Sequence, residues 1–224
     1  MKISDLKPRQ NNVDIEGEVK SISTDGYRLS GWTEKVKSIK KSEKILIPSR
    51  FAKEVARIVE RAKEEVSLYP LQEGKMLAIK QGSSEFFLRT IEGEFPNYHA
   101  IIPEGFSVEV FVETEPFLQA LKTALVFSRD ASNIIKIEIE SGKLLVRATS
   151  ASLGEHLSEI PVEMKKGEAG KIAFNGKYLV ELLSNVKKEK LWFGMNEVLK
   201  PGMFRFDEEA QFFYLVMPFK VQET

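Results

Sequence analysis

The sequence predicts an α+β protein of two domains, built from antiparallel sheets with a helix beside each group of strands. A strand pattern followed by a helix pattern recurs three times along the 224 residues. Short alternating runs of apolar and polar residues lie between these units, and such runs are typical of strands joined by tight turns. Because 42% of the residues are hydrophobic, a chain of this length can bury one or two cores.

Polar residues stand at the start of each predicted helix. The side chains of Ser49, Thr114 and Asn175 can accept hydrogen bonds from the free N–H groups of a first helical turn. The strands and the helices that follow them are predicted at 44–48 and about 50–65, at 108–112 and from the cap at Thr114 to about 127, and at 171–174 and from the cap at Asn175 to about 187. Further strands are predicted at 76–79, 86–88, 135–139 and 144–148. The repeated unit is therefore a strand, a helix and about three more strands.

A domain boundary is predicted near Pro103-Glu104-Gly105, which divides the chain into domains 1–104 and 105–224. The second domain holds two full units, whereas the first holds one full unit and a defective one. Residues 1–21 are atypical because Pro8 and the Gln-Asn-Asn cluster at 10–12 break any helix, so the first domain is expected to lack its first helix. The opening residues also resemble the first strand of a single-strand-binding OB domain. Residues 1–26 contain no aromatic residue to stack on bases, which argues against that function.

Composition excludes several classes of protein. The chain has 33 basic and 33 acidic residues, whereas a tight grip on DNA by the chain as a whole usually brings a strongly basic balance. It has no cysteine and no apolar run long enough to cross a membrane, so a cytoplasmic protein is expected. The two histidines, His99 and His156, stand apart from any metal-ligand spacing, and no nucleophile motif occurs. We therefore expect no enzyme, no cofactor and no metal.

Two short segments at opposite ends of the chain carry the most information. Thr24-Asp25-Gly26-Tyr27-Arg28-Leu29-Ser30 is a turn that leads into an alternating strand. Residues 214–221, Tyr-Leu-Val-Met-Pro-Phe-Lys-Val, form an apolar strand with a proline near its end, as sheet edges allow. The residues alone leave two interpretations open: ordinary core strands, or the walls of a Met-lined groove for a partner.

Both segments resemble the bacterial DNA polymerase III sliding clamp (β clamp) family. Two further segments agree in order and spacing, namely Arg89-Thr90-Ile91-Glu92-Gly93-Glu94-Phe95-Pro96-Asn97-Tyr98 with Ile101-Ile102-Pro103, and Ile172-Ala173-Phe174-Asn175-Gly176-Lys177-Tyr178-Leu179. The resemblance covers about residues 22–224 and begins in the family's middle domain, with no counterpart of the usual first domain. It implies the DNA-clamp fold, with helices on one face of the antiparallel sheets.

The resemblance also implies a hydrophobic groove between the middle and last domains, which accepts short linear motifs from polymerases, the clamp loader and repair proteins. Carried over by motif, the groove residues are Thr24, Gly26, Tyr27, Arg28, Leu29, Pro103, Asn175, Tyr178, Leu215, Met217, Pro218, Phe219 and Lys220. Phe219 and Lys220 stand where the family often has Met and Arg. The tail at 222–224 extends past the family's usual end.

Helices of the family line a central hole around duplex DNA, and this chain has candidates for that face. On the helix predicted at 50–65, the cations Arg50, Lys53, Arg57 and Arg61 share one stripe, and the apolar residues occupy another. Arg129, after the second helix, is a further DNA-facing candidate. A solvated surface stripe is the alternative for this helix. The lysine-rich stretch at 35–44 is interpreted as a solvated loop.

The predicted function is a DNA sliding clamp that encircles duplex DNA without reading its sequence and recruits replication and repair proteins through the groove. Rings of this family contain six domains, so a two-domain chain implies a homo-oligomer, possibly a trimer; an open form is the alternative. A rival function is a non-encircling interaction module that binds the same peptides and competes with, or scaffolds, the replication machinery.

Overall fold

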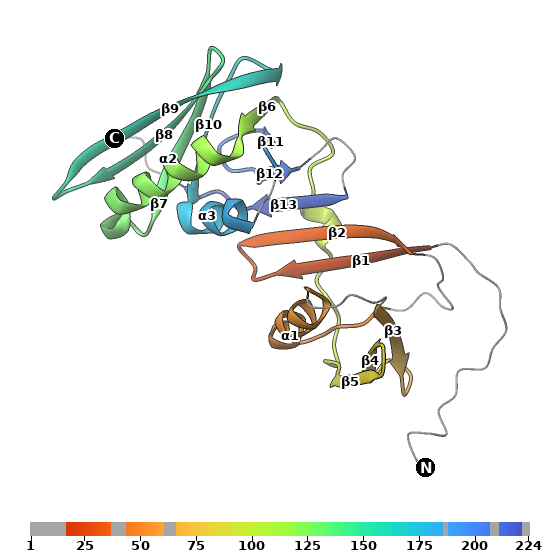
Figure 1. Cartoon of the computed structure of the whole chain (residues 1–224). Helices are drawn as coiled ribbons and strands as arrows, with labels where there is room; N and C mark the ends of the chain where they lie inside the picture. The colour runs from red at the N-terminus through yellow and green to blue at the C-terminus, as the bar shows by residue number, and fades with distance from the viewer. Residues whose placement is uncertain (1–16, 37–43, 61–65, 186–187, 207–210, 221–224) are drawn as a thin grey trace. The chain divides into compact units, whose positions relative to one another are not determined.

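The computed structural model describes residues 17–36, 44–60, 66–185, 188–206 and 211–220 (Figure 1). Contacts between residues divide the chain into two compact units. Among the described residues, the smaller unit contains 44–60 and 66–98, and the larger contains 17–36 and 99–220. No helix within these ranges is both long enough and apolar enough to span a bilayer.

The smaller unit packs one helix against a three-stranded antiparallel sheet. Helix α1 (Ser49–Glu60) precedes the strands β3 (Val66–Leu71), β4 (Met76–Gln81) and β5 (Ser84–Arg89), which lie in the order β3-β4-β5. Phe51 and Val55 of the helix pack on a core of Leu77, Ile79 and Leu88 from the sheet. The apolar stripe of the helix is thus the face that the sheet covers.

The larger unit is built on a ten-stranded antiparallel sheet in the order β1-β2-β13-β12-β11-β6-β9-β8-β7-β10. The strands are β1 (Gly17–Thr24), β2 (Arg28–Val36), β6 (Val108–Glu113), β7 (Ile134–Glu140), β8 (Lys143–Ser150), β9 (Gly154–Lys166), β10 (Ala169–Asn175), β11 (Lys190–Met195), β12 (Gly202–Arg205) and β13 (Phe212–Val216). The 3₁₀ turns η2 (Tyr98–Ile101) and η3 (Arg129–Ala131) precede β6 and β7.

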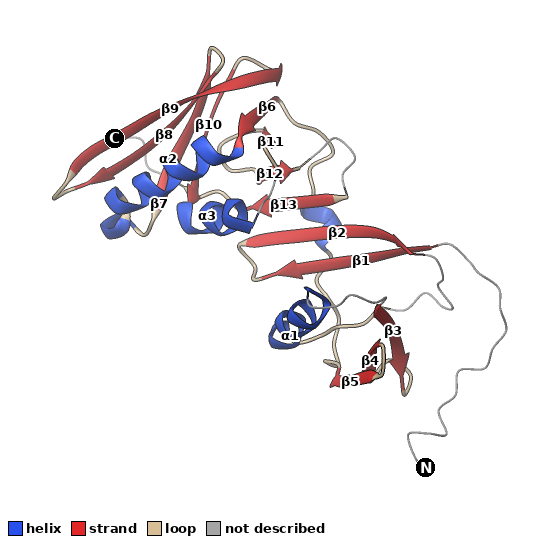
Figure 2. Ribbon diagram, in the orientation of Figure 1, coloured by secondary structure: helices blue, strands red, loops and turns tan. Residues whose placement is uncertain are grey.

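Two helices cover the same side of this sheet. Helices α2 (Thr114–Phe127) and α3 (Gly176–Asn185) pack against each other over the strands (Figure 2). Phe117 of α2 is fully buried, and the rings of Phe193 and Phe204 stack in the sheet below with centroids 4.6 Å apart. The α+β class and the antiparallel sheets with helices on one face are therefore confirmed.

Two local expectations need correction. Residues 44–48 do not form a strand; Leu46 accepts one hydrogen bond, from the Ile91 N–H, and Pro48 has no N–H to extend a ladder. Thr114 is the first residue of α2 rather than its cap, and its hydroxyl is buried without a hydrogen-bond partner. The hairpin β1–β2 pairs with β13, so its contacts group it with residues 99–220.

Candidate peptide-binding groove

The turn between β1 and β2 is held by its own side chains. The Thr24 hydroxyl accepts a hydrogen bond from the Gly26 N–H at 3.1 Å and donates one to the Arg28 carbonyl at 2.7 Å. One carboxylate oxygen of Asp25 accepts from the N–H groups of Tyr27 and Arg28, each at 3.1 Å. Gly26 has a φ of +89°, which glycine adopts without steric cost. The Thr-Asp-Gly sequence therefore sets the shape of the turn and the start of β2.

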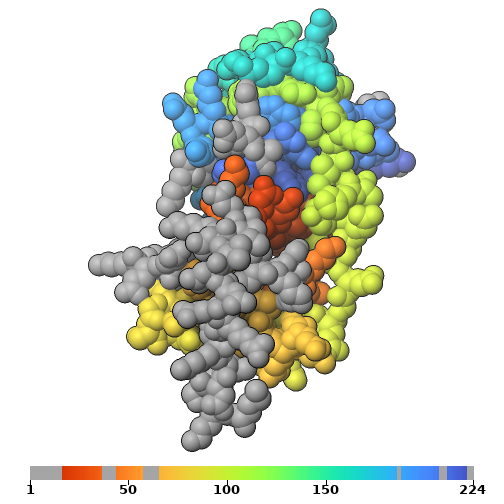
Figure 3. Space-filling view, turned by 90° about the vertical axis from the view of Figure 1, so that its right-hand side faces the viewer, coloured from red at the N-terminus to blue at the C-terminus, as the bar shows by residue number. Residues whose placement is uncertain are grey.

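The two informative segments lie side by side, as predicted. In the ladder between β2 and β13, Leu29 faces Leu215 and Arg28 faces Val216. The next residue of the C-terminal segment continues the contact, because the Met217 N–H donates to the Tyr27 carbonyl at 2.9 Å. In the space-filling view the red and orange hairpin lies directly against the blue C-terminal strands (Figure 3). We call this junction the β2–β13 seam.

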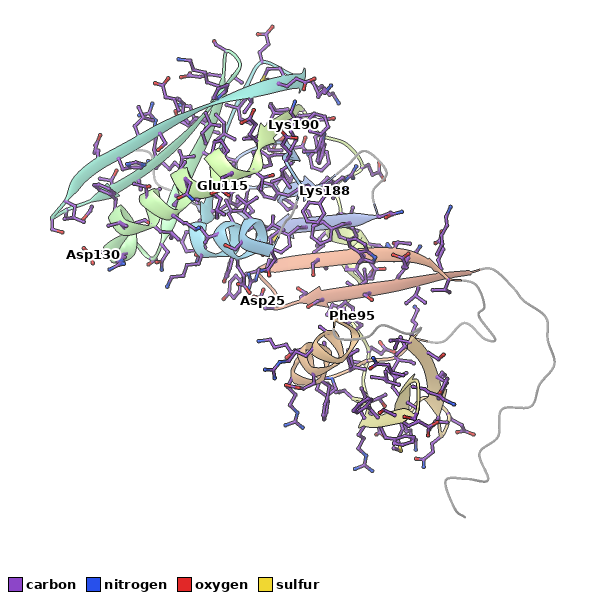
Figure 4. The ribbon with its side chains drawn as sticks, in the orientation of Figure 1. Asp25, Phe95, Glu115, Asp130, Lys188 and Lys190 are labelled. Atoms are coloured by element: carbon purple, nitrogen blue, oxygen red, sulfur yellow. The ribbon has the colours of Figure 1, made fainter. Side chains whose placement is uncertain are left out.

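Arg28 ties the hairpin to α3 and β13. Its Nη1 donates to the Glu181 carboxylate at 2.7 Å and to the Tyr214 hydroxyl at 3.1 Å, and its Nε donates to Asp25 at 3.0 Å. The guanidinium also lies over the ring of Tyr178, 4.4 Å from its centroid. Figure 4 shows Asp25 at the end of the hairpin beside α3. We call Arg28 with its partners Asp25, Tyr178, Glu181 and Tyr214 the Arg28 cluster.

The cluster shifts the pKa values of its members. Burial alone would lower the pKa of Arg28, but the hydrogen bonds to Glu181, Tyr214 and Asp25 raise it overall. Burial also raises the pKa of the Tyr214 hydroxyl, and the nearby guanidinium only partly offsets this. For Asp25 the balance is reversed: partial burial raises the pKa, and the bonds from Tyr27 and Arg28 outweigh it, so the net shift is downward. Arg28 therefore stays charged and Asp25 stays ionised through the neutral range.

We expect the turn to weaken in acid. The folded pKa of Asp25 lies below its ordinary value of 3.8, so its stabilising effect is complete above that value and is lost as the pH falls through the folded pKa. The difference in free energy of unfolding between wild type and Asp25→Asn should be constant near neutral pH and should shrink below about pH 4. Urea titrations of both proteins across this range measure it. A difference that grows in acid would contradict the assignment.

Three exposed apolar side chains lie where the β1–β2 turn meets the C-terminal segment. Tyr27, Met217 and Phe219 are 63%, 40% and 44% exposed. Leu29 and Leu215 are only 3% and 2% exposed, so these predicted wall residues belong to the core beneath the surface. The Phe219 N–H donates to the Ala173 carbonyl at 2.7 Å, which holds the C-terminal segment against the end of β10.

The other predicted groove residues have different surroundings. Asn175 is half-buried and caps α3, since its side-chain oxygen accepts from the Lys177 N–H at 3.0 Å. Tyr178 supports Arg28, whereas Lys220 is exposed and Pro218 is half-buried beside Met217. Pro103 is half-buried in the segment between η2 and β6. Sequence reasoning missed Glu181 and Tyr214, because no local pattern connects either residue to Arg28.

A second surface lies on the helix side of the larger unit. Arg129 lines a hollow of about 540 Å³ together with Lys122 and Lys177. These three exposed cations come from η3, α2 and α3, and the hollow is completed by Leu125, Val126 and Asn133. Lys122 and Lys177 were not singled out from the sequence, since only the packing of α2 on α3 brings them together.

The basic stripe on α1 lies on the exposed face of that helix. Arg50, Lys53 and Arg57 are exposed, whereas Phe51 and Val55 pack on the core of the smaller unit. Arg57 pairs with Glu54 at 3.3 Å, and both side chains remain largely solvated. Arg61 lies outside the described residues. The amphipathic division of this helix agrees with the predicted stripes.

Comparisons with known proteins give a consistent family. The model of the DNA polymerase III beta subunit central domain matches residues 8–97, and that of the C-terminal domain matches residues 99–220. The beta sliding clamps of Rickettsia felis and Staphylococcus aureus are 27% and 21% identical to the chain, over 90% and 92% of its length. The alignments cover 56% and 54% of those proteins, so the chain spans about half the length of the curated relatives it matches.

The fold agrees with these relatives. A crystal structure of a sliding clamp from Pseudomonas aeruginosa bound to griselimycin superposes with a TM-score of 0.84 at 22% identity, over 95% of this chain and 60% of that one. Because one family model alone matches more than half of the residues, the chain belongs to the DNA polymerase III beta subunit family.

Proposed function

We propose that this chain acts as a non-catalytic DNA sliding clamp. Copies of it enclose duplex DNA in the cytoplasm and hold a polymerase and other replication or repair proteins at the template. The observation that carries this proposal is the β2–β13 seam, where Tyr27, Met217 and Phe219 leave apolar side chains exposed beside the Arg28 cluster. Relatives named beta sliding clamp support it.

The seam is the site at which partners dock. Its exposed aromatic and Met side chains can desolvate Leu and Phe side chains of a short peptide, and exposed polar groups such as Lys220 can fix the direction of the peptide. Griselimycin, with which a Pseudomonas aeruginosa clamp was crystallised, is a candidate ligand for the seam. The partners would be polymerases, clamp-loader subunits and repair proteins that carry such peptides.

In each unit, the DNA-facing surface is the side that carries its helices. Lys122, Arg129 and Lys177 form one group of exposed cations, and Arg50, Lys53 and Arg57 on α1 form another. Such cations attract phosphates without contacting base edges, so binding is independent of sequence and allows sliding. The balanced net charge agrees with a clamp that surrounds DNA rather than gripping it.

Retention on DNA of different topology tests the proposed function. Closed circular duplex DNA should retain the protein through a salt wash, and cutting the circle with a restriction enzyme should release it, because only an encircling assembly slides off free ends. Equal loss from both forms, with peptide binding intact, would favour the non-encircling module. A protein that binds neither DNA nor peptide would overturn the proposal.

Removing the helix-side cations should weaken binding to DNA through fewer phosphate contacts. The triple change Lys122→Gln, Arg129→Gln and Lys177→Gln should reduce the slope of log K against log salt by about 2–3, since each phosphate contact contributes about 0.9. Fluorescence anisotropy with a labelled duplex at several salt concentrations measures the slope. Lys20→Gln, Lys136→Gln and Lys190→Gln remove the same charge from strands and form the control. An equal loss in both variants would contradict a DNA-facing role for the helix side.

A further inference from the structure

Methionine carries all the sulfur of this chain, since the sequence has six methionines and no cysteine. All but the first lie in the described residues, and among these Met217 is the exposed one, at 40%. Met195 and Met203 are 0% and 1% exposed in the core. Met76 and Met164 are half-buried. Within the described ranges, the most accessible thioether side chain therefore lies at the seam.

Main-chain hydrogen bonds hold Met217 in place on both sides. Its own N–H donates to the Tyr27 carbonyl at 2.9 Å, and two residues later the Phe219 N–H donates to the Ala173 carbonyl at 2.7 Å. The ring of Pro218, between them, fixes one more backbone angle. Because these restraints belong to the main chain, a chemical change in the Met217 side chain leaves them intact.

We propose that Met217 is an oxidation site and that its sulfoxide weakens the docking of apolar ligands at the seam. The inference rests on the proposed function, because it assigns a regulation to the site where partners dock. Tyr27 and Phe219 are exposed at the same place, so the new oxygen lies among apolar groups that a ligand covers. A polar oxygen in such a contact loses water without gaining a hydrogen bond. Oxidation therefore favours the free seam over the occupied one.

The reaction with a hydroperoxide is a two-electron oxygen transfer. A lone pair of the thioether sulfur attacks the hydroxyl oxygen of the peroxide, so the S–O bond forms as the O–O bond breaks. The proton of that oxygen passes to the leaving oxygen, which departs as water or an alcohol. Methionine sulfoxide reductases reverse the change by oxidising two thiols to a disulfide and releasing the oxygen as water. Docking can therefore be weakened and restored without new synthesis of the protein.

The change spares the fold, because Met217 lies just beyond the last residue of β13 and outside the sheet ladder. The sulfur of Met203 is protected in a different way. It accepts a hydrogen bond from the Arg205 Nε at 3.1 Å, and its residue is buried. The oxidised chain should therefore unfold at the same urea concentration as the reduced chain, which excludes unfolding as the cause of any lost binding.

Mass spectrometry measures the selectivity of the reaction. The folded full-length chain is treated with dilute hydrogen peroxide and digested, and the added oxygen is located by peptide mass. Met217 should gain one oxygen at least about tenfold faster than Met195 and Met203, because oxidation follows exposure. Equal rates at the exposed and the buried methionines would overturn the assignment.

Calorimetric titration measures the effect on docking. After the peroxide is removed, griselimycin and a peptide with adjacent Leu and Phe residues should bind the oxidised chain at least about fivefold more weakly. Methionine sulfoxide reductase should restore the affinity. In Met217→Leu, which has a similar volume but no sulfur, the affinity should be the same before and after peroxide, whatever its starting value. Met76→Leu with Met164→Leu is the matched control and should lose affinity on oxidation as the wild type does.

The outcomes separate the oxidation site from the docking site. An affinity that survives complete sulfoxide formation at Met217, or a loss that persists in Met217→Leu, would refute the regulation and leave the docking site intact. Failure of the unoxidised chain to bind either probe would instead refute the seam as the docking site, and the regulation with it.

Discussion

Arg28→Met should destabilise the larger unit by about 1.5–3 kcal/mol, the range for losing hydrogen bonds to charged groups. Methionine keeps an unbranched side chain of similar length but removes the bonds to Asp25, Glu181 and Tyr214 and the contact with the Tyr178 ring. The Arg28 side chain is only 23% exposed, so water replaces these interactions poorly. Urea unfolding followed by tryptophan fluorescence measures the change.

The two tryptophans make this measurement specific. Trp32 and Trp192 both belong to the larger unit, so their emission reports its unfolding without interference from the smaller one. Arg28→Lys should recover only part of the lost stability. A lysine ammonium lacks the planar, forked geometry with which the guanidinium bonds three acceptors and covers the Tyr178 ring. Lys20→Met, on an exposed pair with Glu18, should change the stability by less than about 0.5 kcal/mol. Equal effects at positions 28 and 20 would contradict the role of the Arg28 cluster.

Met217→Ala with Phe219→Ala should weaken ligand binding at the seam by at least about tenfold, or about 1.4 kcal/mol. Both side chains are about half accessible, so truncation removes surface that a ligand would bury and leaves the core intact. Calorimetric titrations with griselimycin and with a short peptide that contains adjacent Leu and Phe residues measure the loss. An unchanged affinity for both ligands would remove the seam as the docking site.

A control variant tests whether the loss of binding is specific to the seam. Val198→Ala with Leu199→Ala removes comparable exposed apolar surface from the segment between β11 and β12 and should leave binding unchanged. Leu29→Ala is unsuitable as a groove probe, because a buried leucine costs about 2–5 kcal/mol on truncation. Its effect on binding would be confounded by unfolding of the β2–β13 ladder.

Local sequence patterns were sufficient for the elements that depend on local chemistry. The helix predicted to follow a cap at Thr114 and to end near 127 is α2 (Thr114–Phe127), which begins one residue earlier than expected. The Thr-Asp-Gly turn and the cap at Asn175 also follow from side chains that bond backbone groups a few residues away. The strand prediction for 44–48 is wrong. The apolar residues of this segment match a strand pattern, but its contact with the chain after β5 is one hydrogen bond, from the Ile91 N–H to the Leu46 carbonyl.

The amino-acid sequence by itself determined the class of fold, the family and the two segments that meet at the seam, because periodicity, turn residues and motifs are properties of neighbouring residues. Only the tertiary structure decided that Leu29 and Leu215 lie under the surface, that Arg28 bonds Glu181 and Tyr214, and that Lys122 joins Arg129 and Lys177. These contacts join residues far apart in the chain, and their existence depends on how the sheet and helices pack rather than on any local preference.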